Sequence, residues 1–184
     1  CRRRKARRAV TKGKMRMDDN DKPPAERAGN TAYTHTASAP VIAPMRAAHL
    51  DALAELERQA FSRPWSYDAL AEELQNPLAV FMVAEDADGT ALGYLGMHHI
   101  LDEGMVANLV VRADCRRRGI ASALLRQARA YAEEHELNRL TLEVRASNAA
   151  AIALYQSHGF EPEGLRPGFY DSPKEDAAIY SLYL

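Results

Sequence analysis

The sequence predicts one mixed α/β (α+β) domain over residues 41–184, and three observations support this. From Val41 onward, short apolar runs of strand length alternate with amphipathic stretches of helical spacing. The whole chain has 184 residues, which is enough for a single domain with its own core. Residues 1–40 show no such periodicity. The expected element order is β-α-α-β-β-β-α-β-α-β-β, without an internal repeat.

Residues 41–111 are expected to form two helices and four strands. Apolar residues recur every three or four positions in the helices, and the strands end at turn residues. Ser66 is placed to cap the second helix. The expected elements are a strand at Val41–Met45, a helix over Leu50, Leu53, Ala54, Leu56, Glu57 and Ala60, a helix through Leu70 and Leu74, and strands at Val80–Ala84, Ala91–Ile100 and Met105–Val111, with turns at Asp86–Gly89 and Asp102–Gly104.

Residues 112–184 are expected to form two helices and three strands. A strand at Leu140–Arg145 alternates, so that Leu140, Leu142 and Val144 face the core while Thr141, Glu143 and Arg145 face the other way. The remaining elements are a helix after Gly119 with the apolar stripe Ile120, Ala121, Leu124, Leu125, Ala128 and Ala132, a helix at Ala149–Ser157 capped by Ser147 or Asn148 and ended by Gly159, and strands at Phe160–Leu165 and Ala177–Leu184.

The overall charge of −1 hides a division between the two parts of the chain. Residues 1–40 hold eleven Lys/Arg and four Asp/Glu, a net charge of +7, and residues 41–184 hold thirteen and twenty-one, a net of −8. An acidic folded part argues against nucleic acid as its main partner and suits a cationic substrate. The basic block Arg2–Arg8 could touch RNA, but we interpret residues 1–40 as a disordered, solvated tail.

The first residue, Cys1, is not methionine. We interpret the tail as the mark of a truncated or wrongly started gene product, with Met15 or Met17 as the real start, in preference to a functional basic arm. Two cysteines, Cys1 and Cys115, make neither a disulfide framework nor a zinc site. No apolar run reaches the ~18 residues of a membrane helix, and no hydrophobic segment follows the N-terminal arginines. The sequence therefore predicts a cytoplasmic protein.

A basic turn joins the strand that ends at Val111 to the helix that begins after Gly119. Backbone N–H groups, a positive helix end and the three arginines Arg116, Arg117 and Arg118 would there face one anionic ligand, such as a pyrophosphate. Ser122 can also donate in the first turn of the helix. A mononucleotide P-loop would need Lys and Ser/Thr after a longer glycine-rich loop, and a dinucleotide fold would need more glycines.

Other polar residues are weaker candidates when taken alone. Glu143 faces away from the core side of its strand, into a cleft or into solvent, and Tyr155 is as well explained by packing as by chemistry. His98 and His99 point to opposite faces of one strand, which is poor geometry for a shared metal, and no metal site is expected. Cys115 lies beside arginines that would lower its thiol pKa, but an inert or redox-sensitive thiol is the better interpretation.

Taken together, these segments resemble the GNAT superfamily of acyl-CoA-dependent N-acyltransferases. Arg116–Ala121 is similar to its Arg/Gln-x-x-Gly-x-Gly/Ala acetyl-CoA motif. Leu142–Tyr155, Pro64-Trp65-Ser66 and Arg166–Tyr170 look most like the bacterial ribosomal-protein-alanine N-acetyltransferases, although Phe169-Tyr170 stands where two tyrosines are common. The resemblance covers roughly residues 40–184. It implies the GNAT acyl-CoA N-acyltransferase fold, a mixed twisted sheet flanked by helices.

The resemblance also implies roles for individual residues. Glu143 would be the general base and Tyr155 the general acid, and the acceptor amine would be held around Trp65 and Arg166–Tyr170. The implied co-substrate is acetyl-CoA, without a metal. Its binding residues would be Leu109, Val110 and Val111 beside the pantetheine arm, Arg116, Arg117, Arg118, Gly119, Ile120, Ala121 and Ser122 around the pyrophosphate, and Asn148.

The implied reaction is direct attack of an amine on a thioester, so the amine must first lose a proton. An α-amino group has a pKa near ~7.8 and a lysine near ~10.4, so neutralising them at pH 7 costs roughly 1 and 4.6 kcal/mol. One carboxylate suffices for the first case, which favours a protein N-terminus. The resemblance implies a ribosomal protein as partner, namely small-subunit protein eighteen with an N-terminal alanine.

Two other function classes remain open at this point. One is a GNAT enzyme for small amines such as polyamines or aminoglycosides. The other is a non-catalytic acyl-CoA-binding or ribosome-associated module.

Overall fold

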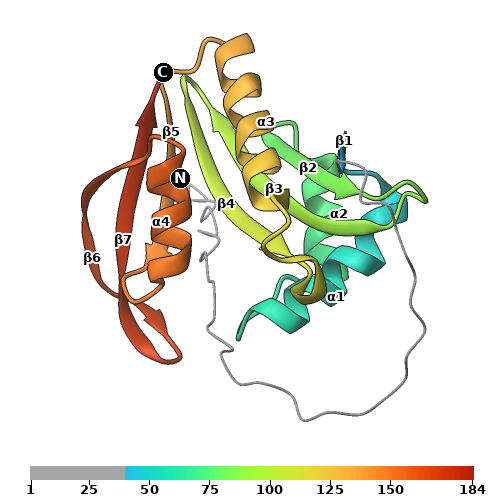
Figure 1. The fold of residues 1–184 in the computed structure, drawn as a ribbon, viewed down its shortest axis with the longest axis horizontal. Coiled ribbons are helices and arrows are strands. Elements are labelled where there is room, and N and C mark those ends of the chain that lie inside the picture. Colours follow the sequence, from blue (N-terminus) through green and yellow to red (C-terminus); the bar gives the residue numbers. More distant parts are fainter. Residues whose placement is uncertain (1–39) are drawn as a thin grey trace, which may run out of the picture.

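In a computed structural model of the protein, the described part of the chain is residues 40–184. The predicted basic tail, residues 1–40, lies almost wholly outside these residues. The described residues form a seven-stranded sheet with helices on both faces (Figure 1). The strands are β1 (Val41–Pro44), β2 (Ala79–Glu85), β3 (Ala91–Ile100), β4 (Glu103–Val111), β5 (Arg139–Arg145), β6 (Glu161–Asp171) and β7 (Lys174–Tyr183), and the helices are α1 (Leu50–Ala60), α2 (Tyr67–Gln75), α3 (Ile120–Glu134) and α4 (Ala149–Ser157), with short 3-10 turns η1 (Ala47–His49) and η2 (Ala113–Cys115).

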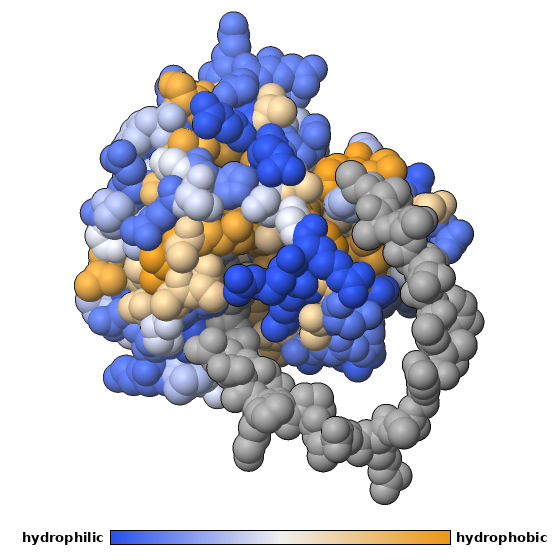
Figure 2. Space-filling model, viewed as in Figure 1, coloured by the Kyte–Doolittle hydropathy of each residue, from blue (hydrophilic) through white to orange (hydrophobic). Residues whose placement is uncertain are grey.

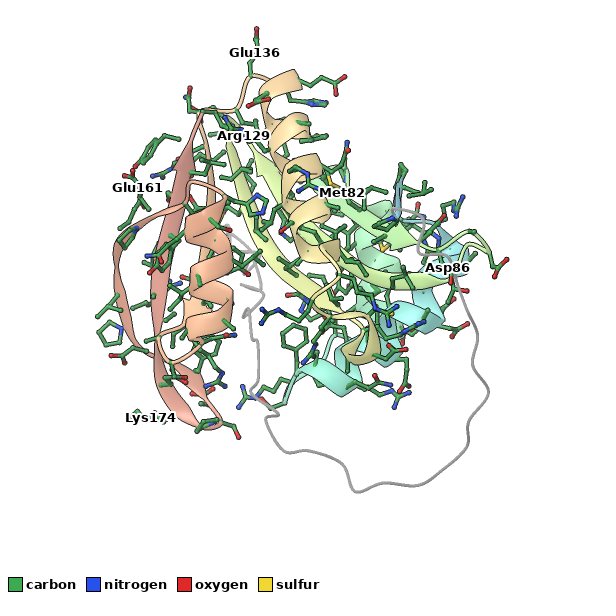
Figure 3. The ribbon with its side chains drawn as sticks, viewed as in Figure 1. Met82, Asp86, Arg129, Glu136, Glu161 and Lys174 are labelled. Carbon is green, nitrogen blue, oxygen red and sulfur yellow. The ribbon has the colours of Figure 1, made fainter. Side chains whose placement is uncertain are left out.

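Two apolar cores lie on opposite faces of the sheet. Because side chains alternate along a strand, Met82 and Ala84 of β2 join the core with α3 and α4, while Phe81 and Val83 join the core with α1 and α2. Figure 1 shows α3 crossing the sheet in front of β2 to β4, and Figure 3 shows Met82 beside it. The mixed α/β architecture predicted from the sequence is confirmed.

The strand order is β1-β2-β3-β4-β5-β7-β6, and β4 with β5 is the parallel pair. These two strands pair only from Glu103 with Arg139 to Val106 with Leu142. At this point Ala107 is an extra residue on β4, because Met97 of β3 lies opposite Val106 and Gly96 lies opposite Asn108. Beyond the bulge β4 continues along β3, β5 continues along β7, and the two strands diverge (Figure 1).

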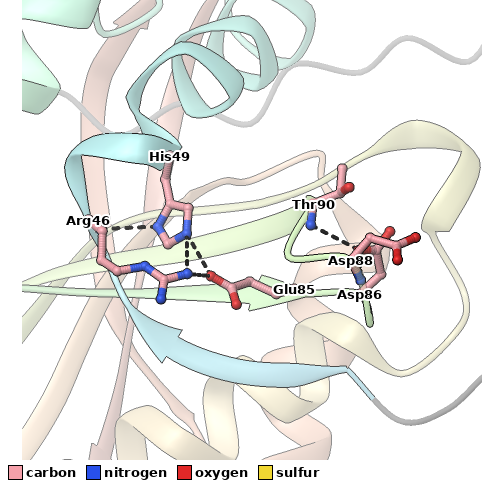
Figure 4. A network of polar contacts seen from close by, with 6 residues as sticks. All are labelled: Arg46, His49, Glu85, Asp86, Asp88 and Thr90. Carbon is pink, nitrogen blue, oxygen red and sulfur yellow. Dashed lines mark hydrogen bonds and ion pairs between the residues drawn. The ribbon is translucent and has the colours of Figure 1, made fainter.

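A polar network fixes the chain between β1 and α1 (Figure 4). Arg46 and the buried His49 both contact the carboxylate of Glu85 at the end of β2, with 2.6 Å between His49 Nε2 and Glu85 Oε1. The Nδ1 atom of His49 accepts a hydrogen bond from the Arg46 backbone N–H at 3.1 Å. Next to it, Asp86 Oδ1 accepts from the backbone of Asp88 and Thr90 and closes the β2–β3 turn.

Hydrophilic residues cover much of the face seen in Figure 2, with apolar areas between them. The exposed large apolar side chains come from separate elements of the described part, namely Val41, Tyr67, Leu78, Ile100, Leu101, Met105, Leu165, Tyr183 and Leu184. Their wide spacing along the chain shows that they are not the face of any one helix or strand.

Most predicted elements are confirmed. Ser66 caps α2 by accepting from Ala69 N at 3.1 Å, and Gly159, with a φ of +85°, follows the end of α4. Two boundaries were wrong. Glu103 and Gly104 belong to β4 rather than to a turn, because they pair with both β3 and β5. The last two strands are longer than predicted and form a hairpin that extends to Asp171 and Lys174, close to the tip shown by Lys174 in Figure 3.

Gly93 of β3 should tolerate no larger residue, because a Cβ there would lie 2.5 Å from the backbone oxygen of Val110. We expect Gly93→Ala to lower the free energy of unfolding by about 1–3 kcal/mol, since the neighbouring strand must shift. Gly164→Ala is the matched control, because no atom lies within 4 Å of its added Cβ and its φ is not positive. Urea denaturation of both variants would measure the difference, and equal stabilities would contradict the expected clash.

Candidate active site

The strand β4 has an edge without a strand partner beyond the bulge. Leu109, Val110 and Val111 pair on one side with Leu95, Tyr94 and Gly93 of β3. On the other side the pairing with β5 has already ended at Val106. Backbone N–H and C=O groups on such an edge can bind an extended, amide-containing ligand as an added strand would.

A tight turn follows this edge and leads into α3. Arg117 and Gly119 both have a left-handed backbone, with φ of +61° and +79°. The first backbone bond of the helix is from Ala123 N to Gly119 O, at 2.9 Å, and no side chain caps its start. The N–H groups of Ile120, Ala121 and Ser122 therefore begin the helix without a backbone partner inside it, which is favourable for an anion.

The three arginines of the turn do not behave alike. Arg116, Arg117 and Arg118 are all exposed. The Nε atom of Arg116 donates to the carbonyl of Val111 at 3.2 Å, so Arg116 also braces the turn against the end of β4. Arg112, just before the turn, donates to Asp114 at 2.7 Å and contacts the sulfur of the buried Cys115 at 3.2 Å. The thiol of Cys115 is buried, and its interpretation as inert or redox-sensitive stays a prediction.

Glu143 lies on β5, one residue beyond the last pair with β4. As the alternation predicts, Leu142 and Val144 are buried, while the side chain of Glu143 keeps 21% of its surface exposed. Its Oε1 atom accepts a hydrogen bond from Nη1 of Arg166 on β6, and that side chain is 43% exposed. The guanidinium of Arg166 also lies 5.0 Å from the ring centre of Phe169. The carboxylate thus has one cationic partner that is open to solvent.

Tyr155 lies on α4 and is 2% exposed. Its ring packs against Phe160, with the ring centres 5.8 Å apart. Burial raises the pKa of its hydroxyl well above the ordinary value of 10.0. The hydroxyl therefore keeps its proton at neutral pH and is available as a donor, so both the packing and the chemical interpretations of Tyr155 are compatible with its position.

Tyr170 is a buried residue close to this pair. Its pKa is raised by burial first and then by the negative charge of Glu143, with a smaller effect from Tyr155. Its hydroxyl finds no hydrogen-bond partner among the described residues. Tyr170 thus lies near enough to Glu143 and to Tyr155 for the charge of each to act on its hydroxyl.

A second network closes the β6–β7 hairpin over this region. Arg145, at the end of β5, is 2% exposed and lies 4.3 Å from the ring centre of Tyr170. It donates to Glu175 at 3.0 Å and to the backbone oxygen of Ser172 at 2.8 Å. Glu175 in turn accepts from the backbone of Ser147 at 2.7 Å. Alternation along β5 placed Arg145 on the face opposite the core, but nothing in the sequence pointed to these partners.

Asn148 is the N-cap of α4, a role that the sequence also predicted. Its Oδ1 accepts from Ala151 N at 3.1 Å and caps α4, the helix that carries Tyr155. Of the two capping candidates, Asn148 is therefore confirmed. A contact of Asn148 with a co-substrate remains a prediction.

The remaining candidates lie elsewhere. His98 contacts Glu73 of α2 at 2.9 Å and His99 contacts Tyr131 of α3 at 3.1 Å, on opposite faces as predicted. No group of three His, Cys, Asp or Glu able to hold a metal is found among residues 40–184. A separate cavity between β1, β2, α2 and α3 is lined by none of the predicted site residues.

Within the described residues, no helix is long and apolar enough to cross a membrane.

Comparison with known proteins places this arrangement in one family. Residues 50–160 match the sequence model of the acetyltransferase (GNAT) family, and the chain belongs to that family. A ribosomal protein bS18-alanine N-acetyltransferase of Escherichia coli (strain K12) is 34% identical over 143 residues, covering 77% of this chain and 95% of its own length. One from Salmonella typhimurium (strain LT2) is 35% identical over 136 residues, covering 72% and 90%.

The fold agrees with this assignment. The crystal structure of the ribosomal-protein-S18-alanine N-acetyltransferase from Escherichia coli matches with a TM-score of 0.72 and 33% identity, covering 78% of this chain and 93% of that one. Both the GNAT fold and membership among acetyltransferases were predicted from the sequence and are confirmed.

The GNAT family uses acetyl-CoA, and the residues here fit it. The open edge of β4 suits the amide-containing pantetheine arm, and the uncapped start of α3 suits a pyrophosphate. A Cβ at Gly119 would meet nothing within 4 Å, so the turn leaves open space at the helix start. When bound there, acetyl-CoA would supply an activated acetyl thioester.

The cap of α4 can be tested separately from any contact with acetyl-CoA. Asn148→Ala should lower the free energy of unfolding by about 1 kcal/mol, because Ala151 N loses its acceptor. Asn148→Asp should restore most of this stability, since a carboxylate also caps. Thermal unfolding of the apoprotein measures both variants, and an unchanged stability in Asn148→Ala would rule out the capping role.

Proposed function

We propose that the chain transfers the acetyl group of acetyl-CoA to the α-amino group of an N-terminal alanine, most specifically that of ribosomal small-subunit protein eighteen. The observation that carries this proposal is a partly exposed carboxylate, Glu143, one residue beyond the last β4–β5 pair, together with a buried, protonated tyrosine, Tyr155, on the helix that follows the same strand. The names of the 34–35% identical relatives support the substrate class.

In the proposed mechanism Glu143 accepts a proton from the substrate ammonium at its carboxylate, directly or through water. The neutral nitrogen then forms a bond to the acetyl carbon, and the carbon–sulfur bond breaks as the nitrogen releases its second proton to water, from which Tyr155 later regains a proton. Tyr155 donates its hydroxyl proton to the departing thiolate. Backbone N–H groups of β4 would stabilise the developing charge on the acetyl oxygen. No covalent enzyme intermediate is required.

The surroundings of Glu143 support its role as the base. Because Arg166 already occupies Oε1, the substrate ammonium would share or take over that place beside the carboxylate. An exposed ion pair is worth at most about 1 kcal/mol, so a cationic substrate can displace it at little cost. The acidic balance of residues 41–184 also favours a basic peptide.

Removal of either proton-transfer group should slow turnover strongly. We expect Glu143→Gln and Tyr155→Phe each to lower kcat by roughly 10²–10⁴, the usual contribution of general acid–base catalysis. The matched controls are Glu161→Gln and Tyr183→Phe at exposed positions of β6 and β7. Steady-state acetylation and calorimetric acetyl-CoA binding would be measured for all four. Wild-type turnover in either site variant would reject the role of that residue.

The acceptor preference can be tested with three substrates. We expect acetylation of a peptide that begins Ala-Arg, weak activity on spermine, and almost none on a lysine side chain in an N-terminally blocked peptide. The difference in pKa alone makes the lysine about 400-fold less often neutral at pH 7. Mass spectrometry locates the acetyl group. Spermine as the better substrate would favour a small-amine enzyme, and tight acetyl-CoA binding without transfer would favour a non-catalytic module.

A further inference from the structure

We propose that the buried carboxylate of Glu57 on α1 is a positioning residue for acetyl transfer, which holds the loop at Trp65 and the bulge of β4 at Asn108 in a fixed relation. The inference rests on the proposed function, because it assigns the acceptor amine to the Trp65 side and the thioester to β4. Glu57 is not itself a catalytic residue, since it contacts only protein groups.

Three neutral donors surround the Glu57 carboxylate. Oε1 accepts from the hydroxyl of Tyr94 on β3 and from Nδ2 of Asn108 on β4, the latter at 2.7 Å. Oε2 accepts from the backbone N–H of Trp65 at 2.8 Å. Asn108 Nδ2 also lies 3.0 Å from the Tyr94 oxygen. Glu57, Tyr94 and Asn108 are all at most 3% exposed.

Burying an ionised carboxylate removes its hydration and costs free energy, so the presence of Glu57 in the core needs an explanation. Burial raises the pKa of Glu57, and its three hydrogen bonds act in the opposite direction. All three partners donate, so each suits an ionised carboxylate that only accepts. A leucine would fill a core position without this desolvation penalty. The presence of a carboxylate at this position is therefore better explained by the segments that its hydrogen bonds connect than by packing.

Each partner lies next to a part of the proposed active site. Asn108 is the first residue after the extra residue Ala107, and Leu109–Val111 follow it directly. Trp65 precedes Ser66, the cap of α2, and its ring packs on Phe81 with the ring centres 5.9 Å apart. Glu57 therefore joins the loop at Trp65 to the start of the open β4 edge through a single side chain.

This connection matters because the acceptor and the thioester are placed by elements far apart in the sequence. Residues 57 and 108 are 51 positions apart, and residues 57 and 65 are eight apart. Transfer requires the reacting atoms to approach within ~3–3.5 Å in the right orientation, and a shift of ~1 Å can cost about 10²-fold in rate. A rigid, fully satisfied buried network can hold two segments with that accuracy.

The test uses two single substitutions and the double variant that combines them. In Glu57→Gln the new amide N–H₂ group faces groups that themselves donate, so at least one buried hydrogen bond is lost. We expect kcat for the Ala-Arg peptide to fall 10- to 100-fold. The Kd of acetyl-CoA should change by a smaller factor than kcat, because no hydrogen-bond partner of Glu57 belongs to the pyrophosphate turn Arg116–Ser122 and only Asn108 adjoins the pantetheine edge. Asn108→Asp puts two carboxylates together and should also lower kcat.

The double variant Glu57→Gln with Asn108→Asp reverses the direction of the bond between the two side chains. The new amide at position 57 would donate to the new carboxylate at position 108 and accept from Trp65 N. The hydroxyl of Tyr94 would donate to that carboxylate and accept from the amide. We therefore expect the double variant to recover most of the wild-type kcat. If it recovers thermal stability but not kcat, the positioning role is overturned.

Ser181→Ala is the matched control for the loss of a buried hydrogen bond. Ser181 is fully buried and lies 3.0 Å from Thr141 Oγ1, between β5 and β7 and outside the Glu57 network. It should lower Tm with kcat unchanged. Tyr94→Phe is a gentler probe that should still fold and lower kcat three- to tenfold, because it removes one donor to Glu57.

Two results separate this inference from the proposed function. If the wild type acetylates the Ala-Arg peptide and Glu57→Gln or Tyr94→Phe keeps its kcat, Glu57 is only a structural residue and the inference is overturned. If the wild type does not acetylate the peptide at all, the proposed function is rejected and the inference with it.

Discussion

The separation of β4 from β5 after four residue pairs is the constraint on which the rest of this protein depends. Up to Val106 the two strands share backbone hydrogen bonds and belong to one continuous sheet. The extra residue Ala107 disturbs the ladder just where the pairing ends. From there each strand follows its other neighbour, so one edge of β4 is left without a strand partner, and Glu143 lies on β5 beyond the last shared pair.

The same separation decides where the two helix starts lie. β4 leads through η2 and the arginine turn into α3, and β5 leads through Ser147 and Asn148 into α4. The start of α3 has no side-chain cap, which suits an anion. The start of α4 is capped by Asn148, and the same helix carries Tyr155 further along. In the proposed mechanism, co-substrate binding and proton transfer are thus divided between two strand–helix units, and the paired halves of the strands hold these units together.

The sequence predicted the elements well because their signals are local. Apolar spacing, the caps Ser66 and Asn148 and the glycine after α4 lie within a few residues of what they determine. The contacts of Glu143 with Arg166, Arg145 with Glu175 and Glu57 with Asn108 join residues 23, 30 and 51 positions apart. Alternation predicts which face a side chain takes, but not its partner on another strand. Glu143 is on β5 and Arg166 is on β6, and β7 lies between these two strands in the sheet. The order of the strands along the chain therefore does not predict this contact either.

The two glutamates show why only one of them suits proton transfer. Glu57 is closed off from solvent and surrounded by neutral donors from the α1–α2 loop, β3 and β4, so an exchange of partner would leave a buried donor unsatisfied. Glu143 is partly exposed, and its cationic partner Arg166 can turn to solvent. A base must release one partner and accept another in each turnover. That requirement favours the open ion pair over the buried network, and it leaves Glu57 free to serve as a fixed anchor.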